Sequence, residues 1–207
     1  MESQPSEEDG MTWSLVSTGP YMEQLDGFVC GPVNQREDGT VVFATLAGQG
    51  HVPFIALKDL AFFARYAFDH RSETSAKDLK IASDMASYDY IAATFTKVTG
   101  KKAVVLHVTE EQYFSILTDT DLPLARDHER GDGSKTWREN ITSWWALYRD
   151  DVVKRDMAWI DSVNPNRLSV EKWMKETNYT GKLKPISLKN VEDGLSVGLD
   201  VQRASQL

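Results

Sequence analysis

The sequence predicts an α/β protein, because short strand patterns alternate with amphipathic helix patterns along the chain. Apolar residues make up 41% of the 207 residues and charged residues 26%, which is typical of a globular protein with an apolar core. This length suits one sizeable domain, or a domain and a half. We therefore expect strands and helices to share one folded unit.

The first ten residues are polar and acidic, so we expect 1–10 to form a disordered tail, with ordered structure starting near Met11. Residues 12–17 alternate β-branched or aromatic residues with polar ones, and Gly19-Pro20 follows them. This pattern predicts a first strand that ends at a turn.

Strand patterns continue through the middle of the chain, where short β-branched runs are bounded by turn residues. These runs predict strands at 40–46, 51–55, 79–82 and 103–108. Glycines and prolines make 26–40 a predicted loop, with at most a short strand at 28–30. Gly48-Gln49-Gly50 predicts a turn. Phosphate contact is the less favoured alternative there, because no third glycine follows and no helix begins.

The clearest helix pattern covers 56–69, where apolar residues recur at positions i, i+3 and i+4. Capping residues mark other helix starts, and Gly100 stands where a helix would end. Further helices are predicted at 87–98, 109–117, 136–149, 152–162 and 169–177. The end of the chain shows little pattern, so we expect a flexible tail at 191–207 and a folded domain at 11–190.

Charge and hydropathy exclude several classes of partner. The net charge is −8 and no block of lysine and arginine occurs, which argues against nucleic acid as a partner. No apolar run approaches the roughly 20 residues that span a bilayer, and the amino terminus is acidic where a signal peptide is basic. We therefore expect a cytoplasmic, possibly nuclear, protein with no membrane partner.

The cysteine and histidine content predicts no metal site. Cys30 is the single cysteine, and it has no activating base beside it in the sequence. The four histidines are scattered, without the spacing that places two ligands on one helix face. His107 lies in an apolar run and is expected in the core, whereas His51 and His128 lie in turns or loops and can titrate near neutral pH.

Several stretches resemble the NmrA-like family, whose members are atypical relatives of the short-chain dehydrogenases. The resemblance is carried by MTWSLVSTGPYME at 11–23, VPFIALKDL at 52–60, KDLKIASD at 77–84 and IAATFTKVTGK at 91–101. The first stretch is similar to the family's sixth Rossmann strand and the turn after it. Covering 11–180, the resemblance implies the carboxyl-terminal portion of such a protein, a partial Rossmann-like sheet remnant with the α/β substrate lobe.

The resemblance also implies that the dinucleotide-binding half is missing from this chain. No G-x-G-x-x-G occurs, and none of the seven tyrosines is followed by lysine four positions later. We therefore expect a truncated protein that is not competent alone to bind a dinucleotide. A second copy in a homo-oligomer, or a protein partner, would then supply the missing lobe.

Members of that family bind NADP or NAD and act as redox sensors and regulators, or as oxidoreductases of small organic molecules. In the family, the turn after the first strand lies beside the nicotinamide. Glycine in this turn permits close approach of a ligand, although the turn can equally be a simple strand terminator. The candidate cofactor-binding residues are Gly19, Pro20 and Tyr21. The candidate substrate-binding residues are Met22, Gln24, His51 and Trp144, and no catalytic residue is assigned.

Alternatives remain for these residues and for the function. Trp144, Trp145 and Tyr148 either stack on a flat ligand or build core, and Met22 can equally be a packing residue. A cofactor-free isomerase, lyase or cyclase would use Tyr21, His51 and the tryptophans. A regulator that binds a protein partner would expose an apolar patch instead. The acidic pair at 150–151 is expected to be solvated surface.

Overall fold

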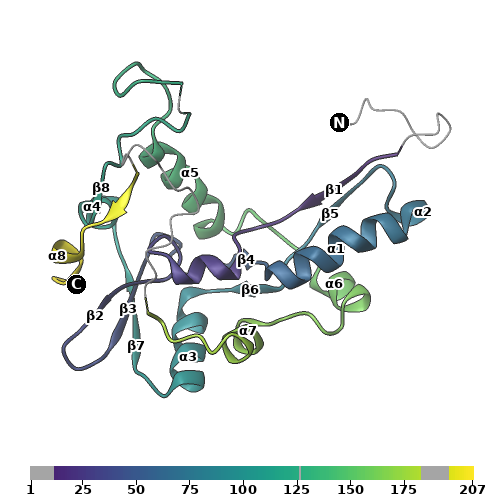
Figure 1. The fold of residues 1–207 in the computed structure, drawn as a ribbon, viewed down its shortest axis with the longest axis horizontal. Coiled ribbons are helices and arrows are strands. Elements are labelled where there is room, and N and C mark those ends of the chain that lie inside the picture. The colour runs from purple at the N-terminus through teal and green to yellow at the C-terminus, as the bar shows by residue number, and fades with distance from the viewer. Residues whose placement is uncertain (1–11, 126, 183–195) are drawn as a thin grey trace.

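The computed structural model describes residues 12–125, 127–182 and 196–207 (Figure 1). The predicted tail at 1–10 lies outside these residues. The strands are β1 (Ser14–Ser17), β2 (Pro32–Gln35), β3 (Val41–Thr45), β4 (Val52–Phe54), β5 (Lys77–Lys80), β6 (Asp84–Ala86), β7 (Ala103–His107), β8 (Leu117–Thr118) and β9 (Gly198–Leu199). The helices are η2 (Met22–Asp26), α1 (Leu57–Asp69), α2 (Arg71–Thr74), α3 (Tyr88–Thr99), α4 (Glu110–Ser115), α5 (Trp137–Arg149), α6 (Met157–Val163), α7 (Val170–Glu176) and α8 (Val201–Ala204).

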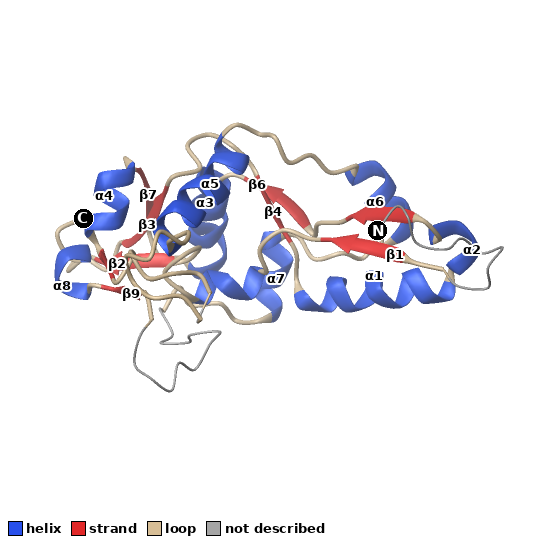
Figure 2. Cartoon of the chain, turned by 90° about the horizontal axis from the view of Figure 1, so that it is seen from above, coloured by secondary structure: helices blue, strands red, loops and turns tan. Residues whose placement is uncertain are grey.

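The chain forms two groups of elements that lie side by side along its long axis (Figure 2). One group contains the parallel pair β1 and β5 with α1, α2 and α6. Its small core includes Ile55, Phe63, Leu79 and Ile160, all at most 5% exposed. We call this group the β1 lobe.

The second group, which we call the β3 lobe, is built around the sheet β2-β3-β7. β3 is parallel to β7 and antiparallel to β2, and all five of its residues are buried. A continuous β-branched and aromatic run of this kind suits a central strand covered on both faces. Helices α3, α4 and α5 surround this sheet and complete the larger core (Figure 2).

The antiparallel pair β4 and β6 lies between the two lobes (Figures 1 and 2). All three residues of β4 are buried. The segment after β1 joins this pair, because Tyr21 forms an isolated parallel bridge with Ile55. β4 is therefore the element through which the end of β1 is connected to the middle of the fold.

The helix boundaries agree with the capping pattern in the sequence. The Ser87 hydroxyl accepts a hydrogen bond from the backbone N–H of Tyr90, and Gly100 ends α3 with a left-handed φ of 72°. Thr109 and Gln112 form both hydrogen bonds of a capping box at the start of α4. These local signals predicted where α3 and α4 begin and where α3 ends.

Several parts of the fold differ from the sequence prediction. The helix predicted at 152–162 begins only at Met157, and the helix predicted at 109–117 ends at Ser115, because Leu117–Thr118 pairs as β8 with β9. β2 lies within the predicted loop at 26–40 and forms because Pro32 and Val33 are buried against β3. β9 and α8 lie within the predicted flexible tail at 191–207, so that prediction is wrong for 198–207. β9 pairs with β8, and Ala204 is fully buried. Residues 183–195 lie outside the described part of the chain.

A buried carboxylate connects three segments of the fold. Asp59, in the first turn of α1, is 3% exposed. It accepts hydrogen bonds from the Ser83 hydroxyl, from the side-chain amide of Asn164 at 3.1 Å and from the backbone N–H of Leu168 at 2.9 Å. A buried charge is tolerated when its lone pairs are satisfied in this way. Asp59 therefore fixes α1 to the segments before β6 and α7.

Replacing this carboxylate is expected to destabilise the protein strongly. Asp59→Ala leaves three buried donors without an acceptor, and we expect the free energy of unfolding to fall by about 3 kcal/mol. Urea denaturation followed by circular dichroism measures this change. Asp69→Ala is the matched control, because Asp69 pairs with Arg65 on the exposed face of the same helix and should cost less than about 1 kcal/mol. Equal losses in both variants would contradict this role of Asp59.

A second prediction concerns pH and the contact between α3 and α7. Lys175 and Lys97 both donate to Glu171 and lower the pKa of its carboxyl from 4.5 to about 2. Because the folded pKa lies below the ordinary value, this stabilisation is present above pH 4.5 and is lost as the pH falls toward 2. Glu171→Gln should thus lower the melting temperature at pH 7 and have a smaller effect at pH 3. The same effect at both pH values would disprove the prediction.

Candidate functional site

The turn after β1 is locked onto β4 by its backbone. The backbone N–H of Ile55 donates to the Pro20 carbonyl, and that of Met22 donates to the Ile55 carbonyl, both at 2.9 Å. A Cβ atom on Gly19 would lie 2.0 Å from the Pro53 carbonyl oxygen. Glycine is therefore required at position 19 by the close approach of β4. The space where its side chain would lie is filled by protein, not left open to a ligand.

The residues that follow this turn point mainly into protein. Pro20 and Met22 are buried, Met22 completely. Tyr21 is half-buried against the core of the β1 lobe. The Gln24 side-chain oxygen accepts a hydrogen bond from the Cys30 thiol at 3.7 Å. For Met22 this geometry supports the packing alternative, and the predicted ligand roles of the other three remain predictions.

The turn at 48–50 packs against the end of α5. Gly48 has a left-handed φ of 54°, and a Cβ atom on Gly50 would lie 1.9 Å from the Tyr148 carbonyl oxygen. Strand β4, not a helix, begins after this turn. The two glycines therefore serve a tight turn and a close backbone approach, and no helix N-terminus stands behind them to receive a phosphate.

His51 follows this turn directly, and its side chain pairs with a carboxylate. Its Nδ1 lies 3.2 and 3.3 Å from the two carboxylate oxygens of Asp151, and its backbone N–H donates to the same carboxylate at 3.0 Å. That backbone hydrogen bond is the main reason that the pKa of Asp151 is lowered. Asp151 also has a left-handed φ of 49°, an uncommon conformation for a residue with a side chain.

This pair has the geometry of an oriented acid or base. The side chain of His51 is 48% exposed, and none of the hydrogen bonds within the described residues uses its Nε2. A carboxylate on Nδ1 fixes the ring and leaves Nε2 to exchange a proton with a bound molecule. The sequence predicts only solvated surface at Asp150 and Asp151. The role of Asp151 was not predictable, because Asp151 and His51 are 100 residues apart in the chain.

The aromatic cluster of α5 is mainly core. Trp145 and Tyr148 are 1% and 5% exposed, and only Trp144 is half-buried, with its ring centroid 4.9 Å from that of Tyr148. Burial raises the pKa of Tyr148 to about 12, so its hydroxyl stays protonated at neutral pH. Burial likewise raises the pKa of Cys30 to about 12, which argues against a nucleophilic thiol. Within the cluster, Trp144 alone keeps a surface for a ligand.

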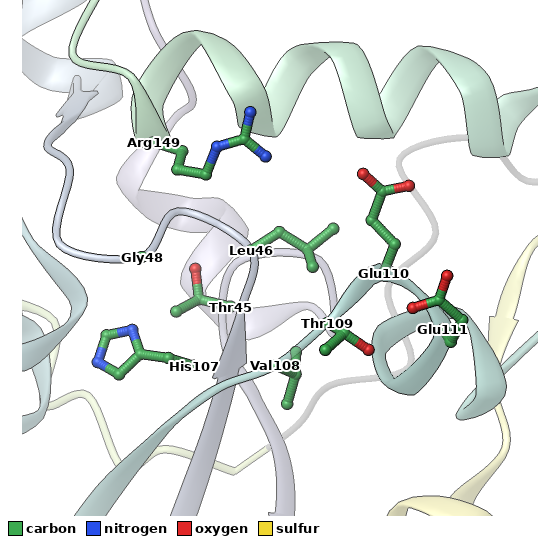
Figure 3. Close-up of a pocket in the computed structure, with 9 residues that line it drawn as sticks. All are labelled: Thr45, Leu46, Gly48, His107, Val108, Thr109, Glu110, Glu111 and Arg149. Atoms are coloured by element: carbon green, nitrogen blue, oxygen red, sulfur yellow. The ribbon is translucent and has the colours of Figure 1, made fainter.

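A pocket of about 510 Å³ lies beside Gly48 of the 48–50 turn (Figure 3). It lies where the parallel strands β3 and β7 end, which is the edge of a parallel sheet where ligands commonly bind. Arg149 projects toward it from α5 and Glu110 from α4 (Figure 3). Arg149 is already paired with Asp150 at 2.9 Å. The pocket is lined by Thr45, Leu46, Gly48, His107, Val108, Thr109, Glu110, Glu111 and Arg149.

His107 was expected in the core, but the structure places it at the exposed end of β7. Its Nε2 lies 3.4 Å from the Gln49 side-chain nitrogen and 3.4 Å from the Asp89 carboxylate. Gln49 of the 48–50 turn thus lies beside His107, which lines the pocket, and His51 follows the same turn in the chain. Side chains alternate between the two faces of a strand, and the apolar run alone does not show on which face His107 lies.

The His128 ring in the loop before α5 pairs with Asp132 at 2.8 Å, which raises the pKa of His128. Within the described residues, no group of three or more histidine, cysteine or acidic side chains is arranged to hold a metal ion. No helix in that same part of the chain is both long and apolar enough to cross a membrane.

Comparisons with known proteins identify relatives of this fold. The model of the NmrA-like family matches residues 6–129. Agroclavine dehydrogenase of Claviceps fusiformis is 24% identical over 118 residues, which are 56% of this chain and 39% of that protein. The chain therefore spans well under half of this curated relative.

Solved structures show the same fold at low sequence identity. A nucleoside-diphosphate-sugar epimerase from Staphylococcus aureus matches with a TM-score of 0.59 and 14% identity, over 82% of this chain and 54% of its own. The negative transcriptional regulator NmrA, in complex with NAD, matches with a TM-score of 0.56 and 10% identity, over 84% and 53%. These matches confirm the α/β fold, and the chain spans about half the length of each structure.

The glycine contacts at this site lead to a stability prediction. Gly50→Ala places a methyl group on the Tyr148 backbone, where no flexible side chain can yield, and should lower the free energy of unfolding by about 3 kcal/mol. Gly39→Ala is the control, because Gly39 has a φ of 82° but no atom within 4 Å and should cost about 1 kcal/mol. Chemical denaturation measures both. A loss at Gly50 no larger than at Gly39 would show that α5 is not held against the turn.

Proposed function

The chain belongs to the NmrA-like family, and we propose that it forms the substrate side of an NAD(P)-linked protein, either an oxidoreductase of small organic molecules or a redox-sensing regulator. The observation that carries this proposal is the attachment of the β1 turn to β4. Gly19 lies against Pro53, and His51 stands two residues before Pro53, about 7 Å along the strand. We propose that the predicted cofactor turn and the His51–Asp151 pair, which lie this close together, form one surface.

The residues around the turn after β1 fit only one end of a dinucleotide. The turn at 19–21 offers backbone and one half-buried tyrosine ring, which suits contact with a flat ring such as nicotinamide. A pyrophosphate requires converging N–H groups or cations, and the glycines at 48 and 50 are occupied by packing on α5. We propose that the phosphates are held by residues outside the described part of the chain, in a longer protein, a second copy or a partner.

The residues of this surface have separable tasks in the proposal. A bound NAD(P) would supply hydride transfer. Asp151 holds the His51 ring, and His51 gives or takes a proton at Nε2 as charge develops on a substrate. Trp144 supplies an apolar wall. Tyr148 and Cys30 take no part in proton transfer, because burial keeps both protonated.

One observation favours a second candidate, a regulator that binds a protein partner. Within the described residues β1 pairs only with β5, so its other edge is open to a further strand. An open edge of this kind accepts a strand from the same or another molecule. Complex formation through this edge is compatible with the first proposal, because the strand that pairs there can belong to the part that holds the phosphates.

The proposal predicts that the two ends of the dinucleotide behave differently. Nicotinamide mononucleotide and NADPH should shift the backbone NMR signals of Tyr21 and His51, with affinities near the millimolar range, because only one end of the cofactor is held. Adenosine 2′,5′-bisphosphate should leave these signals unchanged. The protein is isotope-labelled and first shown by circular dichroism to unfold cooperatively.

The other outcomes are informative as well. No shift at Tyr21 and His51 with any nicotinamide compound would overturn the proposal. A shift of the Tyr21 or His51 signal by the adenosine bisphosphate would show a phosphate site beside this turn and would refute the division between the two ends. Turnover of a small molecule without added nucleotide would favour the cofactor-free isomerase, lyase or cyclase.

A further inference from the structure

A second pocket, of about 690 Å³, lies at the edge of β5 that faces away from β1. Its walls come from β5, from the ends of α1 and α2, and from the segment that leads into α6. These elements lie together in the β1 lobe (Figure 1). The pocket is lined by Tyr66, Glu73, Thr74, Lys77, Asp78, Leu79, Lys80, Lys154, Arg155, Asp156 and Trp159. It shares no lining residue with the pocket of Figure 3.

Three lysines line this pocket beside the carboxylates of Glu73, Asp78 and Asp156. Among the residues that the structure describes, Lys77, Lys80 and Lys154 form no ion pair. All three are exposed. The protein as a whole has a net charge of −8, but the lining of this pocket holds four cations against three carboxylates. The lining is therefore positive by one charge, and its unpaired lysines can attract an anion.

The carboxylates of the pocket are already engaged by other groups. Asp78 accepts a hydrogen bond from the Ser17 hydroxyl at 2.6 Å. Glu73 accepts from the Tyr66 hydroxyl at 3.3 Å, and Asp156 accepts from the backbone N–H of Trp159 at 2.9 Å. These contacts anchor each carboxylate to the protein, whereas the lysine ammonium groups remain available to a ligand.

A fourth cation of the pocket is fixed in place. Arg155 donates from Nε to the Ile81 carbonyl at 3.0 Å and from one terminal nitrogen to the Lys154 carbonyl at 2.9 Å. These bonds use two of the five N–H groups of a guanidinium. A held guanidinium loses little conformational freedom when it binds an anion, in contrast to a free lysine.

Apolar and aromatic side chains form the remaining wall. Trp159 and Tyr66 both pack on the core of the β1 lobe, where the Trp159 ring lies 5.9 Å from that of Phe63. Leu79, 5% exposed, stands between Asp78 and Lys80. A ligand that reaches the cations therefore has an apolar surface beside it. Pockets with a few placed charges and an apolar wall bind small organic molecules.

We propose that this pocket binds a small organic anion, in which a carboxylate or phosphate meets Lys80, Lys154 and Arg155 and an apolar or aromatic part lies against Trp159 and Tyr66. The pocket lies on β5 and not on the turn after β1, so this binding is independent of the proposed NAD(P) site. An anion bound here contacts the segment 154–156 that leads from α5 to α6.

The test uses phenyl phosphate, benzoate, inorganic phosphate and phenol as probes. Calorimetry measures their affinities, and the indole N–H NMR signal of Trp159, assigned with Trp159→Phe, reports the place of binding. Phenyl phosphate, benzoate or both should shift this signal, and the better of the two shows which acid group is preferred. Phenol and inorganic phosphate should bind more weakly, because each lacks one half of the proposed ligand.

Matched variants separate a built site from general charge attraction. Lys80→Gln/Lys154→Gln should weaken binding of the better probe at least about tenfold, since each removes a charged hydrogen-bond donor. Lys102→Gln/Lys135→Gln removes the same charge from exposed positions outside the pocket and should leave binding unchanged. The mutated lysines are exposed, and circular dichroism checks that each variant folds.

Three results would overturn the proposal. The first is no shift of the Trp159 signal by any probe at about 10 mM. The second is an equal loss of affinity in the test and control variants. The third is binding of inorganic phosphate as tightly as phenyl phosphate and benzoate, which would show that the aromatic wall makes no contribution.

Discussion

The arrangement of the two lobes depends on the buried carboxylate of Asp59. Its three acceptor contacts join α1 to the segments before β6 and α7, and the Ser83 hydroxyl acts as a link. The Ser83 hydroxyl also accepts a hydrogen bond from the backbone N–H of Ala56, which lies shortly after β4. The position of β4, and with it the turn after β1 and His51, is therefore coupled to one buried carboxylate, whose lone pairs accept hydrogen bonds from these protein donors in place of water.

Local features of the fold were predictable from the sequence, and long-range pairings were not. The helix at 56–69 and the capping residues Ser87 and Thr109 depend on neighbours within one or two turns, and the structure has them as predicted. β2 and β9 form only because a partner strand lies beside them. Their own residues carry a weak strand pattern, so tertiary contacts decide their conformation.

The candidate site shows the same limit at the level of single residues. Gly19 was singled out because glycine permits close approach, and the structure confirms a close approach, but by the carbonyl of Pro53. The sequence specifies that a side chain is excluded and not which group excludes it. The pairing of Asp151 with His51 could not be predicted, because neither segment carries a sequence pattern that indicates a contact 100 residues away.

The strand pairings also determine how the chain has to fold. The pairing of β1 with β5 brings residue 14 beside residue 77, and the pairing of β3 with β7 brings residue 41 beside residue 103. The two loops that these pairings close overlap along the chain. Neither lobe is a contiguous piece of sequence, and no single cut separates them. Each parallel pair must close a loop of more than 60 residues before it contributes stability, which slows the nucleation of both. The lobes consequently fold as one interleaved unit.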